Sequence, residues 1–105
     1  MSTISTHVLD TSLGQPAANL SIRLFQEDRL IASAGTDANG RCSSLLPPGE
    51  QLAPGVFRLV FDVQSRFPDG FFPEVAVSFI VRDPAAHYHV PLLIGAFGYT
   101  TYRGS

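Results

Sequence analysis

The stretch Leu20-Ser21-Ile22-Arg23-Leu24-Phe25 indicates the fold, because apolar and polar residues alternate along it. A period of two places Leu20, Ile22 and Leu24 on one face, as in a half-buried β-strand. Short segments rich in Val, Ile, Phe and Thr recur along the chain, and nine glycines and eight prolines punctuate it. No helical period is sustained, so the chain is expected to be an all-β sandwich or barrel. Eight strands are expected, at residues 4–10, 20–25, 30–36, 41–46, 56–63, 75–81, 88–94 and 99–105.

Turn residues set the expected connections. Asn39-Gly40 predicts a tight hairpin whose two central positions both need positive φ, and Arg41 follows it directly. Gly14-Gln15-Pro16 is expected to break the chain after the first strand. Residues 47–55 begin Pro-Pro-Gly and are expected to form an irregular loop, and the short polar segment 64–70 could hold a single helical turn.

Composition predicts one domain over residues 1–105 that associates with further copies. Hydrophobic residues make up 45% of the chain and charged residues only 15%. Soluble domains usually carry about a quarter charged residues, so part of this surface is expected to be covered in an oligomer. No apolar run approaches the roughly 20 residues that a membrane span needs.

Charge and cysteine content exclude other classes. The net charge is −2, lysine is absent, and no basic cluster exists, so nucleic-acid binding is not expected. The single cysteine, Cys42, cannot form an internal disulfide and is expected to be a buried structural residue. No secretory signal or Ser-Lys-Leu ending is visible, so a cytoplasmic location is expected.

Titratable side chains cluster near the end of the chain. His87 and His89 lie two residues apart and would share a strand face, where they could ligate a metal with His7 as a third ligand. Metal sites normally need three or four well-placed ligands, so neither a metal nor a cofactor is expected. Ser105 does not lie in a nucleophile elbow, and covalent catalysis is poorly supported.

Strand parity suggests a shared surface. If the first and the last two strands are neighbours, His7, His89 and Tyr102 would line one face. Taken singly, His7 and Arg41 are ordinary solvated residues, and Tyr102 is a core or interface aromatic.

Five blocks in order, spread over nearly the whole chain, carry a family resemblance. They are Thr6–Asp10 with Gly14–Ala17, Asn39–Arg41, Phe71–Glu74, Tyr88–Leu93, and Gly98–Thr101 with the ending Tyr102-Arg103-Gly104-Ser105. The sequence resembles the 5-hydroxyisourate hydrolases of the transthyretin-like family, which the ending distinguishes from transthyretin. Family members usually carry a longer segment before the Phe71 block, which puts their short helix in doubt here.

The resemblance implies an eight-stranded, two-sheet β-sandwich with at most one short helix. It also implies a homotetramer, a dimer of dimers, with active sites in a central channel. The reaction would be hydrolysis of 5-hydroxyisourate, the product of urate oxidation, to 2-oxo-4-hydroxy-4-carboxy-5-ureidoimidazoline. The catalytic residues carried over are His7, Arg41, His89 and Ser105, and the substrate-binding residues are His7, Arg41, Ser105 and Tyr102.

These residue types suit hydrolysis by water. A neutral histidine can accept a proton near neutral pH, so His7 or His89 would activate the water while the other holds substrate or protonates the leaving nitrogen. Arg41 would stabilise charge on the carbonyl oxygen. Ser105 would act through its hydroxyl or through a terminal carboxylate that orients a histidine or anchors Arg103. The alternatives are a transthyretin-like small-molecule carrier without turnover and an immunoglobulin-like structural domain.

Overall fold

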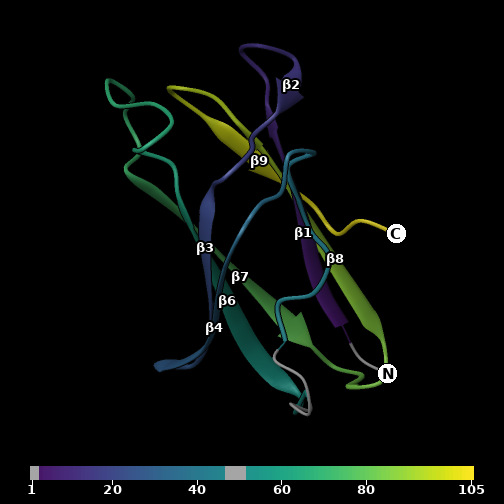
Figure 1. The fold of residues 1–105 in the computed structure, drawn as a ribbon. Coiled ribbons are helices and arrows are strands. Elements are labelled where there is room, and N and C mark those ends of the chain that lie inside the picture. The colour runs from purple at the N-terminus through teal and green to yellow at the C-terminus, as the bar shows by residue number, and fades with distance from the viewer. Residues whose placement is uncertain (1–2, 47–51) are drawn as a thin grey trace.

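The computed structural model, which describes residues 3–46 and 52–105, is a sandwich of two β-sheets (Figure 1). Its strands are β1 (Thr3–Asp10), β2 (Gln15–Pro16), β3 (Ser21–Gln26), β4 (Arg29–Gly35), β5 (Arg41–Cys42), β6 (Gly55–Asp62), β7 (Glu74–Val81), β8 (His87–Ile94) and β9 (Tyr99–Thr101). One sheet has the order β2-β1-β8-β9, with β5 also paired to β1, and the other has the order β4-β3-β6-β7. The all-β sandwich expected from the sequence is confirmed.

The inward faces of the two sheets form the core. Ile22 and Leu24 of β3 are 1% and 0% exposed, as their alternation predicts, and they belong to the same buried cluster as Val8 of β1 and Leu92 of β8. Each such side chain contributes about 1.5–3 kcal/mol when it is removed from water. Alternate residues of β1 and β8 point into this core, so the side chains of the residues between them point to the outer face.

The turn before Arg41 differs from the hairpin expected from the sequence. Only Gly40 of the predicted pair has positive φ (74°); Asn39 does not. The physical reason is Asp37, whose carboxylate accepts hydrogen bonds from the backbone N–H groups of Asn39 (2.8 Å) and Arg41 (3.0 Å) and so shapes a different turn. The strand that follows is β5, which is shorter than the expected 41–46 and pairs with β1 rather than with β4.

Other expected boundaries also change. β2 lies where the sequence indicated a chain break, and its two residues pair with the end of β1. The last strand ends at Thr101 rather than at residue 105, although Gly104 still bridges to His89. The expected loop over 47–55 lies partly outside the described residues.

The shortened segment after β6 contains a turn rather than a helix. The N–H of Phe67 donates to the carbonyl of Val63 (3.0 Å), and Arg66 Nε donates to Asp10 Oδ2 (2.9 Å), which fastens the segment to β1. Burial raises the pKa of Asp10, but hydrogen bonds from Ser12, Arg66 and Leu13 outweigh it and leave the pKa below its usual value.

In residues 3–46 and 52–105 no helix is long and apolar enough to cross a membrane.

Gly40 sets the distance between the β5 turn and β1. The carbonyl of Gly40 accepts a hydrogen bond from Val8 N–H (2.7 Å), and a Cβ added at Gly40 would lie 2.4 Å from the carbonyl oxygen of Val8. Only glycine tolerates both this approach and the positive φ. The contact fixes the register in which Arg41 lies opposite His7.

We expect Gly40→Ala to lower the free energy of unfolding by about 2 kcal/mol or more, because strain at positive φ and a backbone clash add together. Gly14→Ala is the matched control, since Gly14 also has positive φ (65°) but has nothing within 4 Å of the added Cβ. Thermal or urea unfolding of both variants measures the difference. Equal losses would show that the close approach to Val8 is unimportant.

Candidate active site

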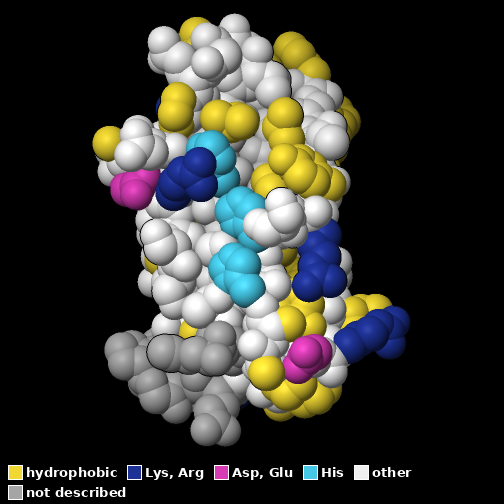
Figure 2. All heavy atoms as spheres, turned by 90° about the vertical axis from the view of Figure 1, so that its right-hand side faces the viewer, with side chains coloured by type: hydrophobic (Ala, Val, Ile, Leu, Met, Phe, Trp, Pro, Cys, Tyr) yellow, Lys and Arg dark blue, Asp and Glu magenta, His cyan; other side chains and the backbone are white. Residues whose placement is uncertain are grey.

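The outer face of the five-stranded sheet carries the candidate residues. β1 and β8 are parallel neighbours, with Ser5 opposite His89 and His7 opposite Pro91. Figure 2 shows the chain's three histidine side chains in one line on this face. The pairing therefore places side chains that are about 80 residues apart in sequence on one surface.

A hollow of about 270 Å³, here called the His7 hollow, lies on this face. Its lining includes His7, His89, Tyr102 and Ser105, with Leu9 and Leu93 as apolar wall. The common surface predicted by strand parity for His7, His89 and Tyr102 is confirmed.

A second hollow of about 290 Å³, here called the Arg41 hollow, adjoins the first. Arg41, His87, Ser5 and Ser43 line it, and it shares His89 and Ser105 with the His7 hollow. The structure thus brings the four predicted catalytic residues around two hollows that share His89 and Ser105 in their lining.

His89 is the most perturbed base of the site. It is half-buried, and its Nδ1 lies 2.8 Å from the hydroxyl of Ser5. Burial lowers the pKa of His89, and His87, Arg41 and His7 in their protonated forms lower it further. The imidazole is therefore neutral at pH 7, which is the form that accepts a proton.

His7 is held in one tautomer. Its Nε2–H donates to the carbonyl of Asn39 (3.1 Å), so the lone pair of neutral His7 is on Nδ1. The carbonyl belongs to the same turn that carries Arg41. One turn therefore orients the histidine and presents the guanidinium beside it.

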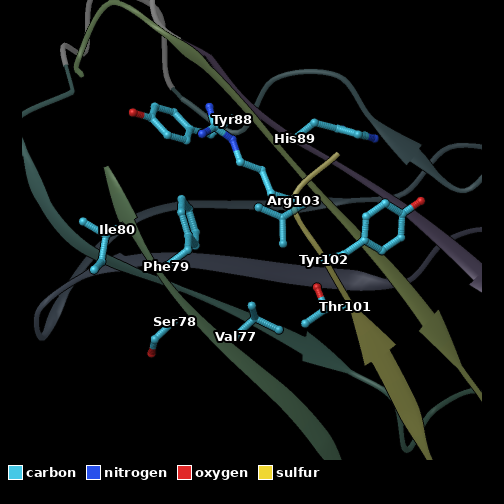
Figure 3. Close-up of a pocket in the computed structure, with 10 residues that line it drawn as sticks. Val77, Ser78, Phe79, Ile80, Tyr88, His89, Thr101, Tyr102 and Arg103 are labelled. Carbon is cyan, nitrogen blue, oxygen red and sulfur yellow. The ribbon is translucent and has the colours of Figure 1, made fainter. Parts of the chain in front are cut away.

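The C-terminal segment 102–105 is laid along β8 by three contacts. Gly104 N–H donates to the carbonyl of His89 (2.8 Å), and Arg103 Nη2 reaches the carbonyl of His87 (3.5 Å). The Arg103 guanidinium also lies 4.8 Å from the ring centre of Tyr88, a cation–π contact visible in Figure 3. These contacts bring Ser105 to the border of both hollows.

Gly104 is in tight contact with the ring of His89. A Cβ at this position would lie 2.5 Å from His89 Cδ2 and 3.1 Å from Pro91 Cγ. Glycine is required here because the segment passes directly over the imidazole. The ring is therefore packed between Gly104 on one side and Ser5 on the other.

A third, apolar hollow of about 300 Å³ lies on the other side of this segment (Figure 3). It lies between β7 of the opposite sheet and residues 101–103, which include Tyr102, and His89 also borders it. Tyr102 thus stands between the His7 hollow and the apolar hollow.

Sequence reasoning missed Ser5 as a partner of His89 and placed His87 beside His89 only as a possible metal ligand. Ser5 Oγ lies 3.2 Å from His87 Nε2 as well as 2.8 Å from His89 Nδ1, and Thr3 Oγ1 contacts His87 Nδ1. Parity with His7 could have placed Ser5 on this face, but its contacts depend on the register of β1 against β8.

In the described ranges no group of three or more His, Cys, Asp or Glu side chains could hold a metal ion. Cys42 is buried, and burial raises the pKa of its thiol.

Comparison with known proteins identifies the family. The model of the HIUase/Transthyretin family matches residues 4–104. The chain belongs to this family. A 5-hydroxyisourate hydrolase from Mus musculus is 40% identical over 114 residues, covering 99% of this chain and 96% of the relative.

Two solved structures share the fold. Klebsiella pneumoniae 5-hydroxyisourate hydrolase superposes with a TM-score of 0.89 at 33% identity and covers 100% of this chain and 94% of that one. Sea bream transthyretin in complex with thyroxine has a TM-score of 0.88 at 26% identity, with coverages of 97% and 94%. The predicted family is therefore confirmed, and the same sandwich occurs in a 5-hydroxyisourate hydrolase and in a transthyretin solved with thyroxine.

We expect an NMR titration to give His89 a pKa below 6.5, and Arg41→Gln to raise it, because removing a nearby cation favours the protonated imidazole. Arg23→Gln is the control, since Arg23 lies on the other sheet over the ring of Phe25 and does not act on His89. A pKa that stays unchanged in the Arg41 variant would contradict the electrostatic arrangement described here.

Proposed function

We propose that this protein hydrolyses 5-hydroxyisourate to 2-oxo-4-hydroxy-4-carboxy-5-ureidoimidazoline, a step in urate breakdown. The observation that carries the proposal is the gathering of His7, Arg41, His89 and Ser105 around two adjoining hollows. The names of the relatives bear out the enzyme class expected from the sequence, at about 40% identity over nearly the whole chain.

Water attack on a ring carbonyl needs a base and a stabiliser of the oxyanion. We assign the base to His89, because its lowered pKa keeps the imidazole unprotonated at pH 7. Arg41 lines the Arg41 hollow and lies opposite His7 in the strand register, and it stabilises charge that develops on the carbonyl oxygen.

The remaining residues hold the substrate. His7 accepts a hydrogen bond from a ring N–H through Nδ1, since its Nε2–H is already bound to Asn39. Ser105 lines both hollows, and Tyr102 lines one side of the His7 hollow. These roles use only side chains and water.

We further propose that residues 1–105 form one domain and that four copies assemble as a dimer of dimers. Support comes from the low charge content and from large exposed apolar side chains such as Ile80, Tyr99 and Phe97, which are 51%, 44% and 76% exposed. Gel filtration should give about four times the 11.3 kDa of one chain. A cytoplasmic location stays a prediction.

We expect purified protein to accelerate the ultraviolet decay of 5-hydroxyisourate generated from urate in situ. His89→Asn should lower kcat by about 10²–10⁴-fold, which is the usual contribution of a proton-transferring side chain. His7→Asn should chiefly raise KM and lower kcat/KM, because His7 holds the substrate. Gel filtration of each variant controls for assembly. Decay that wild-type protein does not accelerate would sink the enzyme proposal and favour the carrier, a role that thyroxine-bound sea bream transthyretin illustrates on this fold.

We expect Gly104→Ala to lower kcat at least tenfold with little loss of stability, because the added methyl must displace the His89 ring or lift Ser105 from the hollows. Gly98→Ala is the matched control, since nothing lies within 4 Å of the Cβ added there. Steady-state kinetics and thermal unfolding of both variants separate the two effects. Full activity of Gly104→Ala would show that the packing of segment 102–105 on His89 is dispensable.

A further inference from the structure

Hydroxyl and imidazole groups alternate along the outer face beside the base. Thr3 Oγ1 contacts His87 Nδ1, His87 Nε2 lies 3.2 Å from Ser5 Oγ, and Ser5 Oγ lies 2.8 Å from His89 Nδ1. β1 supplies the two hydroxyls and β8 the two histidines, whose rings are nearly parallel (13°) with centres 6.3 Å apart. We propose that Ser5 and His87 are positioning residues that relay a proton to and from His89, an inference that rests on the proposed hydrolase function.

The hydrogen-bond inventory allows two states of this chain. In the first, His89 Nδ1–H donates to Ser5 Oγ, Ser5 donates to His87 Nε2, and His87 Nδ1–H donates to Thr3. His89 Nε2 then carries a lone pair and can act as a base. In the second, His87 Nε2–H donates to Ser5 and Ser5 donates to His89 Nδ1, while His87 keeps its Nδ1–H on Thr3 and is the imidazolium. His89 then carries its proton on Nε2 and can act as an acid. A serine hydroxyl, which donates one bond and accepts others, is suited to link the two rings in both states.

Water attack moves three protons in one direction. The O–H bond of water breaks as its oxygen bonds to the carbonyl carbon, and the proton goes to His89 Nε2. His89 Nδ1–H passes to Ser5 Oγ, and the Ser5 proton passes to His87 Nε2. His89 and Ser5 remain neutral, and His87 becomes the imidazolium.

Collapse of the intermediate reverses the relay. His89 Nε2–H protonates the leaving nitrogen as the ring C–N bond breaks. His87 returns its proton through Ser5 to His89 Nδ1, which restores the first state. Water is the only reagent consumed, and the protein ends with the protons it had at the start.

His89 is more buried than His87, and this burial disfavours positive charge on His89. His89 is half-buried and faces His7 from β1, Arg41 from β5, and Tyr102 with Ser105 from the C-terminal segment. His87 is exposed to water, with Arg103 at its carbonyl. Burial and the neighbouring cations lower the pKa of His89, so moving the charge outward to a hydrated ring reduces the cost of the step.

Kinetics of Ser5 and His87 variants test the relay. Ser5→Ala and His87→Gln should each lower kcat about tenfold or more with KM little changed, because both break proton transfer and neither holds substrate. Ser5→Thr keeps the hydroxyl and should retain most of the activity. Ser33→Ala, an exposed serine on the opposite sheet, is the control. A His87→Gln enzyme with wild-type kcat would overturn the relay, since glutamine can hold Ser5 in place but cannot carry the proton.

A spectroscopic measurement tests the relay without turnover. Imidazole ¹⁵N shifts report which nitrogen of His89 carries the proton, and Ser5→Ala should change that distribution while Ser33→Ala leaves it unchanged. Unchanged His89 shifts in Ser5→Ala would overturn the relay even in an active enzyme. A wild-type protein that turns nothing over but shows the expected shifts would instead refute the hydrolase and retain the hydrogen-bond chain.

Discussion

The parallel pairing of β1 with β8 is the constraint on which the rest of the structure depends. It runs over eight residue pairs, from Thr3 opposite His87 to Asp10 opposite Ile94. Parallel neighbours cannot be joined by a tight turn, so the intervening chain becomes a long connection that includes the whole second sheet. The pairing determines which side chains lie on each face of the sheet. Ile4 and Leu92 point into the core, while His7 and His89 share the outside. A register slip of one residue would exchange the two sets and abolish core and site together.

Two glycines bring the distant parts of the site onto this strand pair. Gly40 lets the β5 turn approach Val8 closely enough to set Arg41 opposite His7. Gly104 lets the C-terminal segment cross the His89 ring closely enough to bring Ser105 to both hollows. Glycine has no Cβ, so at both positions the backbone can approach its neighbour closely without a clash. The site is therefore one strand pair with two segments packed against it.

The pattern of apolar and turn residues was sufficient to predict an all-β sandwich or barrel, its strands near 20–25 and 75–81, and the shared face of His7, His89 and Tyr102. The choice of a two-sheet sandwich came from the family resemblance. The sequence pattern failed where the backbone conformation depends on a side-chain hydrogen bond or on pairing with a strand that is distant in sequence. The turn at Asn39 follows the carboxylate of Asp37, and the partner of β5 is β1, which lies far away in sequence. The four proposed catalytic residues came from motif resemblance rather than from physics. Ser5 escaped both routes, and parity placed His87 beside His89 only as a possible metal ligand, because the contacts of Ser5 and His87 depend on the interstrand register and on side-chain rotamers.

The sandwich alone does not decide between catalysis and binding. Sea bream transthyretin, solved with thyroxine, matches this backbone as well as the Klebsiella pneumoniae hydrolase does, with TM-scores of 0.88 and 0.89. The difference must then lie in side chains of the outer face, where this chain places a neutral histidine, a guanidinium and linked hydroxyls around shared hollows. That face is open in one chain, and Arg41 is exposed there. In the proposed tetramer a second copy would cover it and exclude water, which strengthens the attraction between Arg41 and a developing oxyanion. Assembly would therefore act on the chemistry as well as on stability.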